Sequence, residues 1–182
     1  MKYNLFENYK ILIFATLTCI CITIFNIDAR AQKIKIPKSK TNSISKPLVK
    51  FEADTFQIFN LINAERAKYS LGLMVWDDDL AIIARDYSER MAKENFFSHF
   101  DSNGQSVLER AKTAKIKHWS KIGENLFSCE NVKSFDAFAV KNWMNSPTHR
   151  ENIINPDWTA TGIGIAQSKD GEIFITQVFI KR

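Results

Sequence analysis

A glutamate and two distant histidines are the residues of this chain best suited to do chemistry. Glu124 lies in the run Gly-Glu-Asn-Leu that begins at Gly123, with His99 upstream and His149 downstream. The chain of 182 residues has three histidines, so two of them bracket this glutamate. A carboxylate beside two imidazoles can transfer protons or hold a metal ion. Sequence separation does not show that side chains meet in space, and a turn-capping Glu124 with two surface histidines explains the same spacing.

The first 31 residues have the pattern of a secretory signal peptide. Two lysines give it a weakly basic start, and threonines are the only polar residues that interrupt the apolar run 11–25. Ala29-Arg30-Ala31 then matches a small-x-small cleavage site. The run is shorter than the roughly 20 residues that a membrane-spanning helix needs. We therefore expect cleavage after Ala31 and a secreted or extracytoplasmic protein, in the periplasm or at the cell surface, that is not an integral membrane protein.

Residues 32–50 have the composition of a flexible linker, because they are polar and show no apolar period. They hold six lysines and no acidic residue, whereas from residue 51 onward 16 basic residues face 18 acidic ones. The excess positive charge therefore belongs to this tail, which could also contact an anionic envelope polymer. The remaining residues, 51–182, are expected to form one domain. It lacks the basic aromatic stripe of a nucleic-acid-binding surface.

Cys129 is the only cysteine that such processing would leave, so no internal disulfide is expected. The domain must then be stabilised by its apolar core. We expect Phe59, Ile83, Phe138 and Trp143 to be buried in that core.

Five helices are predicted from apolar periodicity and from start and stop signals. Three of them cover about 55–69, 79–94 and 107–114. The fourth is a long helix capped by Ser134, and the fifth begins at Ser146-Pro147. No strand is predicted around Glu124, which follows a long loop containing the third histidine, His118.

The end of the chain has the pattern of a β-hairpin. Residues 161–167 show the period-2 alternation of a strand, and residues 172–180 are rich in β-branched and aromatic types. The turn-forming pair Asp170-Gly171 lies between these two segments. Gly162 and Gly164 fall inside the first of these strands with no helix after them. They therefore indicate close packing and not a phosphate-binding loop.

Several short motifs follow one another along the chain in a specific order. They are Asn63-x-x-Arg66, Trp76-Asp77, Phe97-Ser98-His99, Gly123-Glu124-Asn125, the run 143–150 with Asn152, Gly162-x-Gly164 and Thr176-Gln177-Val178-Phe179. Taken together, they resemble the CAP superfamily of cysteine-rich secretory, antigen 5 and pathogenesis-related proteins, and in particular its secreted bacterial branch. The resemblance covers about residues 55–180. It implies an α+β fold, an α-β-α sandwich with a small antiparallel sheet between helical layers and a central cleft.

The resemblance also implies a site, because the family cleft is commonly lined by two histidines and two glutamates. His99 and Glu124 match one residue of each type. Ser146 stands at the place of the second glutamate and Phe174 at the place of the second histidine. The set of two histidines and two glutamates that eukaryotic members of the family have is therefore incomplete here. His149 is the histidine of the bacterial branch. The implied binding cleft consists of His99, Glu124, Asn125, Ser146 and His149.

The resemblance implies two classes of function. The first is a binding module without catalysis, with no required cofactor, for a lipid, a cell-wall polysaccharide or a protein. The second is a metal-assisted hydrolase of peptidoglycan or peptide bonds, with Glu124 as general base and His99 and His149 as candidate Zn²⁺ ligands. A third reading, a structural envelope protein held by its basic tail, is also open. No Ser-His-Asp or HExxH motif singles out the hydrolase.

Overall fold

The computed structural model describes residues 51–182, so the predicted signal peptide (1–31) and linker (32–50) lie outside the described residues. Five helices occur in this range: α1 (Glu52–Lys68), α2 (Asp78–Glu94), α3 (Val107–Thr113), α4 (Phe135–Asn145) and α5 (Pro147–Ile153). The strands are β1 (Val75–Trp76), β2 (Lys121–Cys129), β3 (Ala160–Gln167) and β4 (Ile173–Lys181). Within these residues, no helix combines the length and apolar character needed to cross a bilayer.

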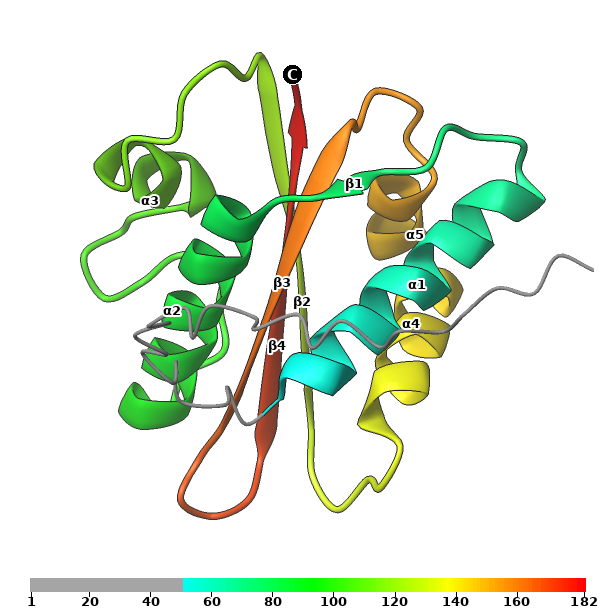
Figure 1. Cartoon of the computed structure of the whole chain (residues 1–182). Coiled ribbons are helices and arrows are strands. Elements are labelled where there is room, and N and C mark those ends of the chain that lie inside the picture. Colours follow the sequence, from blue (N-terminus) through cyan, green and yellow to red (C-terminus); the bar gives the residue numbers. More distant parts are fainter. Residues whose placement is uncertain (1–50) are drawn as a thin grey trace, which may run out of the picture. The chain divides into compact units, whose positions relative to one another are not determined.

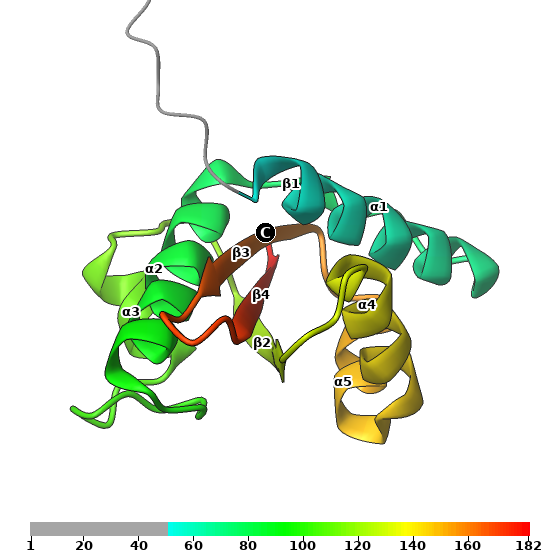
Figure 2. The same ribbon diagram turned by 90° about the horizontal axis from the view of Figure 1, so that it is seen from below.

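The four strands form one sheet in the order β1-β3-β4-β2. The pairs β2–β4 and β3–β4 are antiparallel, and the two-residue strand β1 adds a parallel edge to β3. Figures 1 and 2 show α2 and α3 on one face of the sheet and α1, α4 and α5 on the other. The expected α+β fold with an α-β-α sandwich is therefore confirmed, and β1 makes the sheet mixed. The opposite edge of the sheet is β2, which carries Glu124.

The two glycines of β3 let helix α2 lie directly on the sheet. A Cβ added at Gly164 would be 1.9 Å from the backbone nitrogen of Arg85, and one added at Gly162 would be 2.2 Å from that of Ala81. The Oγ of Ser88 donates to the Gly164 carbonyl at 3.1 Å. The predicted close packing is confirmed, and it fixes the helix from which several residues reach the site.

Arg66 joins α1 to the segment around α5 from inside the fold. The residue is fully buried, and its guanidinium donates to four carbonyls, of Gly72 at 2.9 Å, Ile153 at 2.8 Å, Asn155 at 2.7 Å and Trp158 at 3.4 Å. A buried guanidinium is tolerated only when its donors are satisfied. These bonds therefore tie down the end of the helix that carries His149.

The helices predicted from the sequence are present, but their caps differ in detail. Helix α2 begins one residue before the predicted position and is capped by Asp77, whose carboxylate accepts from the Leu80 N–H at 3.1 Å. Helix α1 starts three residues before the predicted position, with Phe51 at the N-cap and no side-chain cap. Ser134 and Ser146 precede α4 and α5 without a capping hydrogen bond from either side chain.

Strand β2 was not predicted, and its sequence explains why. Its central residues Glu124, Asn125 and Leu126 are all buried, so polar side chains occupy positions that an ordinary strand pattern would fill with apolar ones. Glu124 pairs with Val178 of β4. It therefore projects from a regular strand that follows the loop.

The core differs from expectation at one helix. Ile83 and Trp143 are buried as predicted, and Phe59 is partly buried against the core. The prediction that Phe138 is buried is wrong, because 42% of it is exposed. The buried residues of α4 are Ala139, Val140 and Trp143, which turns the Phe138 ring to the flank, where it meets Phe127 edge-on.

Candidate functional site

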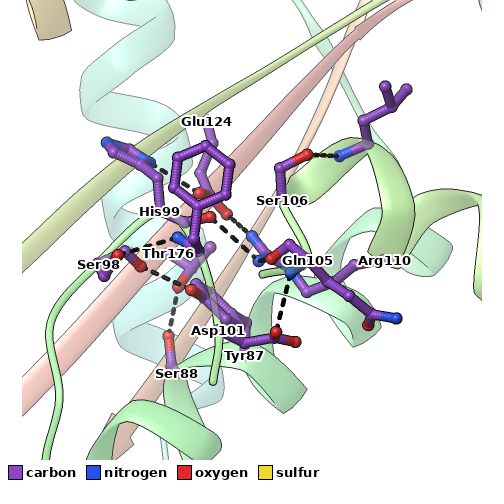
Figure 3. Close-up of polar contacts among 12 residues, drawn as sticks. Tyr87, Ser88, Ser98, His99, Asp101, Gln105, Ser106, Arg110, Glu124 and Thr176 are labelled. Atoms are coloured by element: carbon purple, nitrogen blue, oxygen red, sulfur yellow. Dashed lines mark hydrogen bonds and ion pairs between the residues drawn. The ribbon is translucent and has the colours of Figure 1, made fainter. Parts of the chain in front are cut away.

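The carboxylate of Glu124 is buried and holds a donor on each oxygen. Its side chain is 3% exposed. His99 Nδ1 lies 2.8 Å from Oε1, and Arg110 Nη2 donates to Oε2 in an ion pair. Figure 3 shows Glu124 between these two side chains. Because an ionised carboxylate can only accept, the His99 proton in this bond sits on Nδ1.

Arg110 is the residue of this cluster that the sequence did not reveal. Its side chain is 9% exposed, and its guanidinium lies over the Tyr87 ring, 3.3 Å from the centroid. Nη1 donates to the Gln105 carbonyl at 3.1 Å. A lone arginine in a stretch rich in lysine has the pattern of a solvated surface, so no local signal marks it. Its helix is set by a capping box between Ser106 and Glu109.

The loop that carries His99 is held from both ends. The Tyr87 hydroxyl donates to the Ser98 carbonyl at 2.6 Å, and burial raises the Tyr87 pKa to about 12. The Asp101 carboxylate accepts from the N–H groups of Asn103 and Gln105 at 2.8 and 2.9 Å. The Gln105 bond is the main reason that the Asp101 pKa lies below its ordinary value. This loop thus holds the imidazole of His99 half exposed, at 50% of its side-chain surface.

His149 is positioned from the other side of strand β2. The fully buried Asn125 donates through Nδ2 to the His149 carbonyl at 3.1 Å, and its Oδ1 accepts from Asn152 at 2.9 Å. The Ser146 Oγ lies 2.9 Å from His149 Nδ1, which is why this serine does not cap α5. Burial, followed by the charge of His99, holds the His149 pKa below its ordinary value.

The five expected cleft residues therefore form two bonded groups at one sheet edge. His99 bonds Glu124 directly, whereas Asn125, Ser146 and His149 are joined to one another. Successive side chains of a strand point to opposite faces, so Glu124 faces the α2–α3 layer and Asn125 faces the α4–α5 layer. The two groups are joined at β2, where Asn152 Nδ2 donates to the Glu124 carbonyl at 3.2 Å.

The donor set can be compared with what a catalytic zinc requires. Such a site takes three protein ligands and leaves one position for water. Both oxygens of Glu124 are engaged, which leaves the Nε2 atoms of His99 and His149 as the available metal ligands among these residues. In the part of the chain from Phe51 onward, no group of three His, Cys, Asp or Glu side chains is arranged to hold a metal. The residues as arranged do not fit a catalytic zinc.

Two Bacillus subtilis proteins are similar in sequence. YkwD is 33% identical over 150 residues, which is 82% of this chain and 56% of that protein. The membrane protein YlbC is 34% identical over 126 residues, which is 69% of this chain and 34% of that one. The chain thus spans less than two thirds of the length of either relative.

Two solved structures share the fold and part of the sequence. An extracellular protein of Bacillus anthracis with an SCP domain is 32% identical at a TM-score of 0.62, over 71% of this chain and 41% of that one. An outer surface protein of Borrelia burgdorferi is 25% identical at a TM-score of 0.65, over 74% of this chain and 96% of that one. The family model of the cysteine-rich secretory proteins matches residues 59–179. By this match and by its fold, the chain belongs to the CAP family and is a CAP/SCP-domain protein of the bacterial type.

Proposed function

We propose that this protein is an extracytoplasmic binding module that uses the imidazoles of His99 and His149 beside strand β2 to hold a cell-envelope polysaccharide, without cleaving it. The observation on which the proposal rests is that the Glu124 carboxylate is buried and hydrogen-bonded on both oxygens. A general base must reach the proton that it removes. This carboxylate is 3% exposed and bonded to His99 and Arg110 on its two oxygens. Its role is therefore to orient His99, and the imidazoles are the groups that meet a ligand.

The surroundings of His99 favour a sugar over a lipid or a protein among the ligand classes considered. Phe97 and Phe100, one on each side of the Ser98-His99 pair, are 52% and 60% exposed. Sugar rings present both apolar C–H faces and hydroxyl groups. A loop that carries a half-exposed imidazole and two exposed aromatic rings offers groups that can match both, through hydrogen bonds and apolar contact.

The proposed location follows from the relatives and the N-terminal pattern. The structural relatives include an extracellular protein and an outer surface protein. The predicted signal peptide in residues 1–31 agrees with export. N-terminal sequencing of protein exported by cells should find a first residue of Gln32. A product that still begins at Met1, or one that begins at a lipid-modified Cys19, would contradict the proposed processing.

Binding can be tested by sedimentation with purified peptidoglycan sacculi. The chain from Gln32 onward is assayed at about 0.5 M NaCl, because screening at this salt suppresses attraction by the lysine-rich tail. His99→Ala and Phe100→Ala should each weaken retention about tenfold, which corresponds to about 1.4 kcal/mol. His118→Ala is the matched control, since His118 is exposed and takes no part in the hydrogen bonds of His99 and His149 to Glu124 and Ser146. Equal retention of all four proteins would contradict the proposal.

The hydrolase remains the second candidate, because a buried carboxylate bonded to a histidine is also how many catalytic and metal-binding imidazoles are oriented. Zymography on cell-wall material separates the two functions. Wild-type protein that clears the gel, with clearing lost in Glu124→Gln, would establish hydrolysis. The binding proposal predicts no clearing by either protein.

A further inference from the structure

The contacts of Arg110 make it more than a charge partner for Glu124. Its guanidinium has four partners: the Tyr87 ring beneath it, the carbonyls of Gln105 at 3.1 Å and His99 at 3.4 Å, and the Glu124 carboxylate. Tyr87 and Arg110 come from different helices, α2 and α3. A planar guanidinium with several fixed donors holds a carboxylate in one orientation, which a lysine ammonium cannot do.

We propose that Arg110 is the positioning residue of the Glu124–His99 pair. It locks the Glu124 carboxylate so that Oε1 faces His99 Nδ1, and thereby determines which nitrogen of His99 carries the proton. In the neutral imidazole one nitrogen is a donor and the other an acceptor, and the bond made by one nitrogen selects the form. With Nδ1–H directed at Glu124 at 2.8 Å, the exposed Nε2 is an acceptor. The Nε2 atom of His99 therefore selects a ligand group that donates, such as a hydroxyl or an amide N–H.

Only one part of this inference rests on the proposed binding function, namely that the ligand must offer a hydrogen-bond donor to His99. The state of the His99 ring is a property of the free protein. It can therefore be measured whether or not sacculi bind.

The experiment is ¹⁵N NMR of the imidazole rings at pH about 8.5, two units above the ordinary histidine pKa of about 6.5. Wild-type His99 should be present as a single Nδ1–H form. In Arg110→Met the carboxylate is free to turn, so His99 should become a mixture of both forms and retention on sacculi should fall fivefold to tenfold, the equivalent of one disturbed hydrogen bond. Arg110→Lys should be intermediate. Lys112→Met, on the same helix and exposed, should match wild type in both measurements.

Two outcomes would overturn the inference. One is a wild-type His99 protonated at Nε2, which needs no variant and decides the matter even if Arg110→Met does not fold. The other is an unchanged Nδ1–H form in folded Arg110→Lys and Arg110→Met. If wild-type protein does not bind sacculi while the His99 ring responds to Arg110 as described, the binding function fails and the positioning role stands.

Discussion

Replacing Gly164 with alanine tests whether α2 is held on the sheet as closely as the structure indicates. The added Cβ would lie 1.9 Å from Arg85 N, 2.2 Å from Arg85 Cα and 2.3 Å from the Ala84 carbonyl carbon. Ordinary contact begins at 3.4 Å, so the helix would have to move by about 1.5 Å. All three atoms belong to the backbone, and no side chain can rotate away to relieve the contact.

Overpacking a core costs about 1–3 kcal/mol when side chains can adjust. Because the clash here is with a helix backbone, we expect Gly164→Ala to lower the free energy of unfolding by about 3 kcal/mol or more, which is about 10 °C or more in Tm for a domain of this size. Urea titration followed by circular dichroism gives the free energy, and a thermal melt gives Tm.

Gly72→Ala is the matched control for this experiment. An added Cβ at Gly72 has nothing within 4 Å, and replacing glycine at a compatible site is neutral or stabilises by about 0.4–1 kcal/mol. If Gly164→Ala loses less than about 0.5 kcal/mol, or no more than Gly72→Ala, the close approach of α2 to β3 is refuted.

Three further outcomes are expected. Because the His149 pKa is lowered by burial and by His99, the unfolded chain binds more protons below pH about 6.5, so stability should decrease as pH falls through that range. The decrease should be smaller in His149→Gln and unchanged in His118→Gln, as urea titrations at several pH values would show. Trp143→Ala should cost about 3–5 kcal/mol, whereas Phe138→Ala should cost less than half of that because 42% of Phe138 is exposed; equal losses in denaturant titrations would count against the assigned core. Cys129 is free and, among residues 51–182, no disulfide exists, so reductant should leave Tm unchanged, and a drop of several degrees would contradict this.

The elements that local patterns specify could be predicted from the sequence. Asp77 caps α2 because an aspartate before an apolar period is a local signal, and the β3–β4 hairpin follows from its composition and from Asp170-Gly171. Gly162 and Gly164 indicated close packing before the partner helix was known. These features depend on neighbours in the chain.

The parts that escaped prediction depend on neighbours in space. Strand β2 was missed because Glu124 and Asn125 occupy buried positions for the site and so break the apolar pattern. Arg110 was missed because its partners Tyr87 and Glu124 lie 23 and 14 residues away in the sequence. Phe138 was misplaced because the periodicity of a short helix does not show which side of its apolar stripe meets the sheet.

The measurement that tests the central claim most directly is a mass balance on sacculi incubated with the wild-type protein at about 0.5 M NaCl. Sedimented protein and soluble sugar or peptide fragments are measured in the same tube, alongside His99→Ala and Glu124→Gln. A binding module whose Glu124 only orients His99 predicts saturable retention that His99→Ala weakens about tenfold, with no fragments released by any protein. Release of fragments by wild type that Glu124→Gln abolishes would contradict the account.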